Sequence, residues 1–191
     1  MIGGLSWVST AEYYKCINEM TQEARGGVHS AELILQSVDR QHYVDAVIER
    51  QDEDAACEII LHAAKAVERG GAEFIVISCN DVHRFVPRVA PQISIPFLHI
   101  ADATGCAVQA AGLTTVALLG VRKTMEEPFY PDVLKNHGIT TIIPDEGEKT
   151  YIHDKIYDEL VRDVFTEETR TGYLSIMCDL TDRGAEGVIL G

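Results

Sequence analysis

The sequence predicts an α/β protein of two similar, pseudo-symmetric lobes, each a parallel sheet flanked by helices. Short apolar runs alternate with helical stretches along the whole chain, which is the order of parallel α/β folds. The runs are largely unbroken rather than alternating, as in strands that are buried on both faces. In addition, residues 69–79 and 183–191 both place a glycine helix stop before an apolar strand, which indicates two related halves.

The strands are predicted from apolar runs that turn residues separate. Four runs are strong and two are weaker: Phe74–Ile77, Val116–Leu119, Ile139–Ile143 and Val188–Leu190, then Leu33–Val38 and Pro96–Ile100. The chain begins with a glycine turn at Gly3-Gly4 of the kind that follows a strand, although almost no strand precedes it. Both ends of the chain therefore read as short.

The helices are predicted from caps and apolar spacing. Ser9 or Thr10 is expected to cap a helix that Gly26-Gly27 ends, and Asp52 or Asp54 to cap one that stops at Gly70-Gly71. Later helices are expected over about 101–111, 125–136, 148–162 and 167–183. The acidic stretch 145–148 is interpreted as a solvated turn. The repeat predicts a boundary near residues 97–103, hence one lobe over 1–98 and another over 99–191.

The repeat also predicts what the second lobe lacks. Aligning Gly71 with Gly184 gives an offset of 184 − 71 = 113, so the partner of Cys79 would be residue 192, one beyond the last residue. We therefore expect the lobe over 1–98 to carry Cys79. The lobe over 99–191 is expected to lack the second cysteine of such a pair.

Composition limits the classes of partner and the compartment. With 46% hydrophobic residues the chain can bury a core, and a net charge of −14 argues against binding to nucleic acid or to an anionic membrane. The same charge repels an acidic metabolite, so a carboxylate pocket needs local cations or backbone N–H groups. Five cysteines without disulfide or zinc spacing, and no signal peptide or bilayer-length apolar run, favour the reducing cytoplasm.

Cys79 is the strongest candidate for chemistry, because it follows a strand where parallel sheets bind ligands. Free N–H groups of the next helix would lower its pKa and bind an anion, and Asn80 offers an amide for a carboxylate. The alternative is that Cys79 is an apolar filler. His83 is close enough to polarise the thiol, but a histidine at this position more often caps or solvates a helix.

Each remaining candidate for a functional residue also has a purely structural interpretation. The other four cysteines fall in predicted helices and are interpreted as filler: Cys16, Cys57, Cys106 and Cys178. Thr124 follows a strand and could bond a carboxylate, or cap a helix with Glu127 completing a capping box. Gly3-Gly4-Leu5-Ser6 resembles an anion-cradling loop, and His99 could be either a pocket wall or a core residue. There is no Walker loop, no GxGxxG and no metal-spaced cluster, so no cofactor is expected.

The chain resembles the aspartate/glutamate racemase family over essentially its whole length. The matching blocks occur in order: Ile2–Thr10 with Tyr13-Tyr14, Gly26–Ala31, Cys79-Asn80 with His83, Leu98–Thr104, Leu118–Arg122, Thr124–Glu126, Phe129-Tyr130, Tyr157–Leu160 and Gly184–Gly191. This resemblance implies two α/β lobes with the active site in the cleft between them, and racemisation without pyridoxal phosphate. Two residues, usually cysteines, then flank the substrate Cα, because inversion needs a proton donor and acceptor on opposite faces.

Carried over by motif, Cys79 is the acid/base of the first lobe. Leu5, Ser6, Asn80, Asp81 and Val82 would line the site of an acidic amino acid, and Thr124 would donate to its carboxylate from the second lobe. A homodimer is compatible with the sequence, which does not fix the oligomeric state. The resemblance does not choose between aspartate and glutamate.

Several positions depart from the family pattern. Asp81 replaces the usual threonine and would oppose a bound carboxylate unless it is protonated or turned away, and Pro87 interrupts a helix. Val8 replaces a usual glutamate. The resemblance also implies a second catalytic cysteine and a closing segment after the final block, which the lobe over 99–191 is expected to lack. These departures and the two short ends leave an alternative open: an inactive truncated homologue that at most binds an acidic amino acid. A third interpretation is a relative acting on hydantoins, maleate or malonates, although Trp7 and the Thr124–Glu126 block fit the amino-acid branch better.

Overall fold

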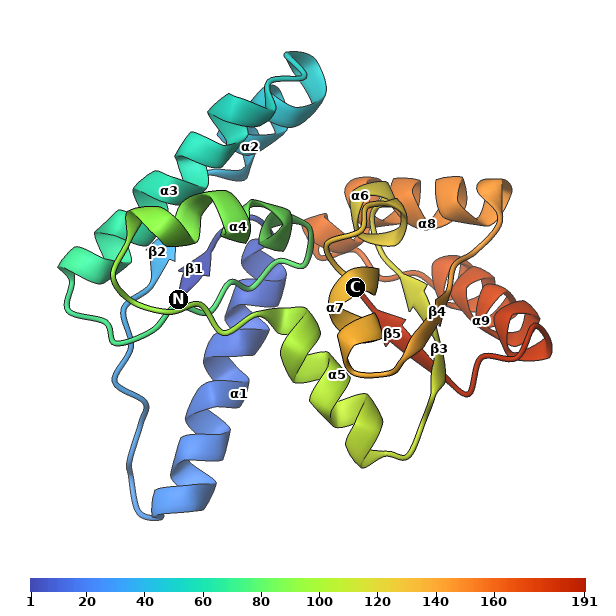
Figure 1. Cartoon of the computed structure of the whole chain (residues 1–191), viewed down its shortest axis with the longest axis horizontal. Helices are drawn as coiled ribbons and strands as arrows, with labels where there is room; N and C mark the ends of the chain where they lie inside the picture. Colours follow the sequence, from blue (N-terminus) through green and yellow to red (C-terminus); the bar gives the residue numbers. More distant parts are fainter. The chain divides into compact units, whose positions relative to one another are not determined.

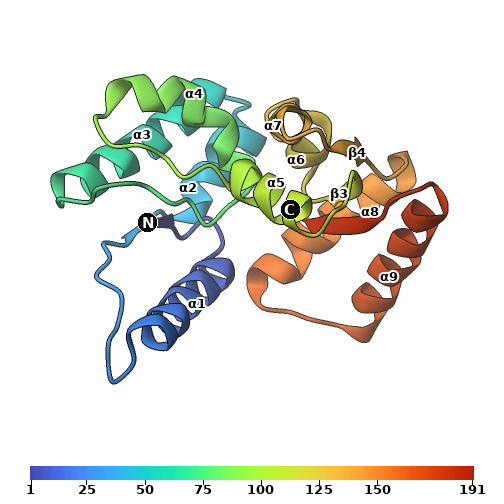
Figure 2. The same cartoon turned by 60° about the horizontal axis from the view of Figure 1, so that its bottom comes forward.

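Parallel strands with helices packed against them make up both parts of the chain. The computed structural model describes all of residues 1–191, and the chain divides into two units, Met1–Leu98 and His99–Gly191. Figures 1 and 2 show the elements of each unit. The mixed α/β class and the flanked parallel sheets that the sequence predicts are confirmed.

The first unit contains two short strands and one long buried helix. Its elements are β1 (Ile2–Gly3), α1 (Trp7–Arg25), β2 (Gln36–Ser37), α2 (Arg40–Val44), a π-helical turn (Asp45–Glu49), α3 (Glu53–Arg69), a 3₁₀ turn (Asp81–Phe85), α4 (Val86–Val89) and a second 3₁₀ turn (Ala90–Gln92). β1 pairs in parallel with β2, Ile2 opposite Gln36. Single parallel bridges join Ile2 to Ile77 and Ile75 to Phe97. The runs expected as strands near 74–77 and 96–100 therefore contribute extended segments with one or two bridges each.

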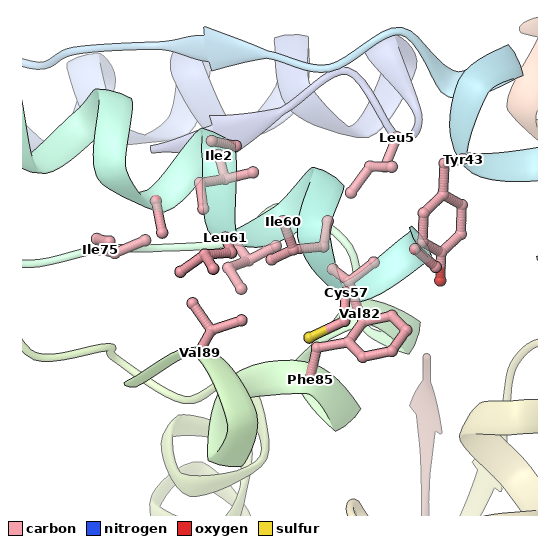
Figure 3. Close-up of a cluster of buried hydrophobic side chains, with 14 of the residues drawn as sticks. Ile2, Leu5, Tyr43, Cys57, Ile60, Leu61, Ile75, Val82, Phe85 and Val89 are labelled. Atoms are coloured by element: carbon pink, nitrogen blue, oxygen red, sulfur yellow. The ribbon is translucent and has the colours of Figure 1, made fainter. Parts of the chain in front are cut away.

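The core of this unit forms between the extended segments and α3. Ile60, Leu61 and the alanines of α3 are buried because the apolar positions of this helix recur at helical spacing. Figure 3 shows Ile2 and Ile75 gathered with Ile60 and Leu61. α3 begins after Asp52, whose carboxylate accepts the Ala55 N–H, so one of the two expected caps is confirmed.

The second unit is built on a three-stranded parallel sheet. Its elements are α5 (Ile100–Ala110), β3 (Thr115–Leu119), α6 (Arg122–Glu126), α7 (Pro131–Asn136), β4 (Thr140–Ile142), α8 (Glu146–Asp158), a 3₁₀ turn (Leu160–Arg162), α9 (Glu167–Asp182) and β5 (Gly187–Leu190). The strand order is β4-β3-β5. Val116 and Leu118 of β3 pack with α5 and α7, whereas Ala117 and Leu119 pack with α8 and α9. The central strand is thus buried on both faces, as its unbroken apolar run predicts.

Three local expectations about where helices begin and end are wrong. α1 begins after Ser6, not at Ser9 or Thr10, because the Ser6 hydroxyl accepts the Ser9 N–H. The helix expected over 125–136 is broken in two, since the chain is extended at Glu127 and Pro131 starts a new helix. Asp145 and Glu148 are not a solvated turn but a capping box that starts α8.

Candidate active site

In the first unit, the turn after β1 and the turn that carries Cys79 lie at the same edge of the sheet. The Ile2 N–H donates to the Val76 carbonyl at 2.8 Å, and the Ser78 N–H donates to the Ile2 carbonyl at 3.0 Å. Parallel strands present their carboxyl ends on one side. The six predicted site residues of this unit therefore gather at that edge: Leu5, Ser6, Cys79, Asn80, Asp81 and Val82.

Side-chain hydroxyls connect the two turns. Thr10 Oγ1 accepts the Gly4 N–H at 2.9 Å and lies 2.9 Å from Ser78 Oγ, and Ser9 Oγ donates to the Ser78 carbonyl at 3.0 Å. Gly4 has a φ of +86°, and a Cβ there would overlap the Val38 carbonyl, so the turn requires glycine. The hydroxyl groups of the first turn of α1 thus fix the backbone just before Cys79.

The thiol of Cys79 is protonated under ordinary conditions. Burial raises its pKa to about 11, and the nearby Asp81 carboxylate also raises it. Backbone N–H groups of Val82 and Asp81 and the Arg40 guanidinium act in the opposite direction without reversing the shift. The expectation of a lowered pKa is therefore wrong, because burial outweighs the backbone donors. The free protein holds a proton donor at this position rather than a thiolate.

Asp81 does not present an isolated charge. Tyr43 Oη donates to Asp81 Oδ2 at 2.6 Å, and the Arg84 guanidinium lies 3.0 Å from Asp81 Oδ1. Arg84 also donates to Tyr43 Oη at 2.7 Å and to Glu53 at 2.8 Å. We call these four residues the Arg84 cluster. Burial and the neighbouring Asp81 raise the pKa of Tyr43. The pKa of Arg84 is also raised, because the effect of Asp81 and its other neighbours outweighs burial, which acts to lower it. The Asp81 carboxylate is thus paired with the Arg84 guanidinium. This cation compensates the negative charge that Asp81 introduces where the family usually has a threonine.

Asn80 and His83 have different surroundings. The Asn80 side-chain oxygen is buried without a hydrogen-bond partner in the chain, so it is available to a ligand donor. His83 is buried, and its Nδ1 lies 2.9 Å from the backbone carbonyl of Cys79. The imidazole therefore contacts the main chain of Cys79 through Nδ1 and supports the turn there.

Leu5, Ser6 and Val82 can offer mainly backbone groups to a ligand. The side chains of Leu5 and Val82 belong to the hydrophobic core of the unit. The Leu5 carbonyl accepts a hydrogen bond from Arg40, and the Ser6 hydroxyl caps α1. The Val82 N–H is directed at the sulfur of Cys79.

Arg40 and Tyr13 are features of this edge that the sequence analysis did not predict as site residues. Arg40 starts α2 directly after the extended segment that contains β2, and its positive charge acts on Cys79. Tyr13 lies on α1, and burial followed by the proximity of Cys79 raises its pKa. The sequence could have indicated Arg40 as a site residue through its position after a strand, because polar residues that follow parallel strands meet at one edge of the sheet.

Thr124 lies in the second unit and is described there by itself. It is fully buried within α6, not at its N-cap, and its hydroxyl has no hydrogen-bond partner in the chain. Its methyl group packs close to Gly120 and Gly191, at the carboxyl ends of β3 and β5. The alternative that Thr124 caps a helix in a capping box with Glu127 is wrong, because the N-cap of α6 is Val121. The Thr124 hydroxyl is therefore free to donate a hydrogen bond at this sheet edge.

Of the other candidates, His99 caps a helix and the four cysteines lie within helices. His99 Nδ1 accepts the Ala101 N–H at 3.2 Å and caps α5. Cys16, Cys57, Cys106 and Cys178 lie within α1, α3, α5 and α9, and Cys57 is the buried one among them. No cluster of three or more histidine, cysteine or carboxylate side chains has the arrangement of a metal site. None of the helices is long and apolar enough to cross a lipid bilayer.

The fold and this edge define a class: a parallel α/β protein that presents a thiol and an unpartnered amide where such sheets bind small polar molecules. The model of the family described as Asp/Glu/Hydantoin racemase matches residues 2–191. The chain therefore belongs to this family, as its sequence motifs predict.

Solved structures and a characterised relative agree with this assignment. The chain is 36% identical to a candidate Asp/Glu racemase from Yersinia pestis, with a TM-score of 0.88, over all of this chain and 83% of that one. It is 30% identical to an aspartate racemase homologue from Pyrococcus horikoshii OT3, with a TM-score of 0.80, over all of this chain and 82% of that one. Over 152 residues it is 24% identical to the broad specificity amino-acid racemase RacX of Bacillus subtilis, covering 78% of this chain. The chain spans 65% of the length of that relative.

Proposed function

We propose that the chain racemises an acidic amino acid, aspartate or glutamate, without pyridoxal phosphate, and that Cys79 transfers the proton on one face of Cα. The observation that carries this proposal is the thiol at the sheet edge, with two backbone N–H groups on its sulfur and an unpartnered amide beside it. The family match and the relative named for broad amino-acid racemisation support the reaction class.

The raised pKa of Cys79 determines how the reaction begins. At neutral pH a thiol with a pKa of about 11 is a proton donor and only rarely a base. An amino-acid substrate brings an ammonium group, and a cation near a thiol lowers the pKa of that thiol. Binding of the substrate would therefore favour the thiolate that removes the Cα proton, with the Val82 and Asp81 N–H groups stabilising the anion.

Charges at the edge suit an acidic substrate. A chain with net charge −14 needs a local cation to hold a carboxylate, and Arg40 provides one near Cys79. The Arg84 cluster keeps the Asp81 carboxylate paired, so that it does not repel the substrate directly. Asn80 would orient a polar group of the substrate, and in the second unit the Thr124 hydroxyl would donate to a carboxylate.

Hydrogen exchange at Cα tests this role of Cys79. The protein is incubated in D₂O with L-aspartate or L-glutamate. Loss of the Cα proton is followed by NMR, and the product enantiomers by chiral chromatography. We expect exchange that falls at least about 100-fold in Cys79→Ser. Cys106→Ser, an exposed position on α5, is the matched control and should leave the rate unchanged. A Cys79→Ser variant that exchanges at the wild-type rate would contradict the proposal.

The same experiment separates racemisation from the alternative of an inactive binder. Exchange with inversion indicates proton transfer on both faces, and exchange with retention indicates transfer by Cys79 alone. Tight binding of aspartate by calorimetry without exchange would support the inactive homologue and overturn the proposed activity.

A further inference from the structure

Tyr13 lies on the face of α1 that is turned towards the Cys79 segment. Two residues one turn earlier on this helix contact that segment directly: Ser9 Oγ donates to the Ser78 carbonyl at 3.0 Å, and Thr10 Oγ1 lies 2.9 Å from Ser78 Oγ. Tyr13 follows Ser9 and Thr10 at helical spacing, which keeps it on the same face. Side chains of a helix lean towards its N-terminus, so the tyrosine ring extends over the preceding turn. The phenol is therefore directed towards the sheet edge where Cys79 lies.

The electrostatic surroundings of the Tyr13 hydroxyl agree with this placement. The side chain is partly buried, and burial followed by the proximity of Cys79 raises its pKa. Cys79 is thus the ionisable neighbour that acts on the phenol. A phenol with a raised pKa keeps its proton throughout the neutral range, so Tyr13 offers a hydrogen-bond donor there and not a base.

The hydroxyl groups around the Cys79 turn differ in whether the chain already uses them. The Tyr13 hydroxyl makes no hydrogen bond within the chain. The neighbouring hydroxyls all have partners in the protein: Ser6, Ser9, Thr10, Tyr43 and Ser78. A tyrosine hydroxyl that is removed from water usually finds a partner. The Tyr13 hydroxyl is therefore available to a bound molecule.

Tyr13 and Asn80 offer complementary hydrogen-bonding groups near Cys79. The Asn80 side-chain oxygen is buried without a partner and is an acceptor that suits an ammonium group. The Tyr13 O–H is a donor that suits a carboxylate. An amino acid carries both of these groups on its Cα. Asp81 cannot supply the donor, because its carboxylate only accepts hydrogen bonds and is paired with Arg84.

We propose that Tyr13 is a substrate-binding residue whose phenol O–H donates to the α-carboxylate of an amino acid bound at Cys79. This inference rests on the proposed function, because it takes the substrate Cα to lie against the thiol. Removal of the Cα proton places negative charge on the α-carboxylate. A donor aimed at this group therefore binds the carbanionic form more tightly than the substrate, so Tyr13 contributes to proton transfer as well as to binding.

Alkylation of Cys79 by two reagents tests this contact without any turnover. Iodoacetate carries a carboxylate on the carbon that the thiolate attacks, whereas iodoacetamide carries a neutral amide there. Peptide mass spectrometry follows both rates at Cys79, with the exposed Cys106 as a reference in each sample. We expect the ratio of the iodoacetate rate to the iodoacetamide rate at Cys79 to fall at least about fivefold in Tyr13→Phe. Tyr14→Phe, an exposed position on the same helix, is the matched control and should leave the ratio unchanged. Both reagents attack the same thiolate, so the ratio does not follow changes in the pKa of Cys79.

An unchanged ratio in Tyr13→Phe, or an equal fall in Tyr14→Phe, would overturn the proposal. So would a lower melting temperature of Tyr13→Phe, because it would mean that the hydroxyl already has a partner in the chain. In the exchange experiment with L-aspartate, Tyr13→Phe should lower kcat at least about tenfold. A wild-type protein that exchanges no Cα proton would count against the proposed function alone, since the alkylation ratio still reports the contact made by Tyr13.

Discussion

The two units end an equivalent strand in different electrostatic surroundings. In both, a long helix stops at a glycine with positive φ, Gly71 or Gly184, and an extended apolar segment follows. In the first unit that segment leads to a thiol beside Asp81 and Arg40. In the second it leads to Gly191, which bonds the Leu119 carbonyl and packs on Thr124. The same backbone plan therefore holds charged groups at one edge and a neutral hydroxyl at the other.

The two units differ most in how deeply their charged side chains are buried. The Arg84 side chain is 5% exposed and holds Asp81, Tyr43 and Glu53 together, whereas Arg122 in the second unit is 33% exposed and pairs with Glu126 and Glu146. An ion pair that is removed from water costs much when one partner is lost, and an exposed pair costs little.

Arg84→Met should lower the free energy of unfolding by about 3–5 kcal/mol, because Asp81 is left charged without its cation in a buried position. Arg122→Met is the matched control and should cost less than about 1 kcal/mol. Urea unfolding of both variants measures the difference. Equal losses in the two variants would show that the Arg84 cluster is not a special feature of the first unit.

The stability of the first unit should depend on pH through Cys79. Its pKa in the folded chain, about 11, lies above the ordinary thiol value of 9.0, so folding favours the protonated form. The stabilisation is present below pH 9 and is lost as the pH rises towards 11, by up to about 2–3 kcal/mol. Comparison of wild type with Cys79→Ser between pH 8 and pH 11 isolates this contribution from other titrating groups. Parallel curves for the two proteins would contradict the raised pKa.

Thr124→Val should stabilise the chain by about 1 kcal/mol, because it removes a buried hydroxyl that has no partner. Thr169→Val is the matched control in the same unit: the Thr169 hydroxyl donates to Glu159, so its loss should destabilise by about 1 kcal/mol. Thermal unfolding gives the sign of each change. A loss of stability in Thr124→Val would mean that the hydroxyl already has a partner, and would weaken its proposed role as a carboxylate donor.

Strands and sheet edges were predictable from the sequence because they depend on local pattern. The unbroken run 116–119 indicates burial on both faces, and the strand end before Cys79 indicates a site. The Arg84 cluster was not predictable, since Tyr43 and Asp81 are 38 residues apart and meet only in the fold. The pKa of Cys79 was predicted in the wrong direction for the same reason: its N–H donors are local, but the burial that outweighs them is tertiary.

The bonds between Ile2 and residues 76–78 have a consequence for how the chain acquires its thiol site. The Ser78 N–H donates to the Ile2 carbonyl, which is 76 residues earlier in the chain, so the neighbours of Cys79 in sequence do not by themselves hold its turn in place. During synthesis, the segment up to about residue 80 must leave the ribosome before the first residues find their partners. An emerging chain therefore carries Cys79 as an ordinary mobile cysteine until closure of this long loop gives it its final environment.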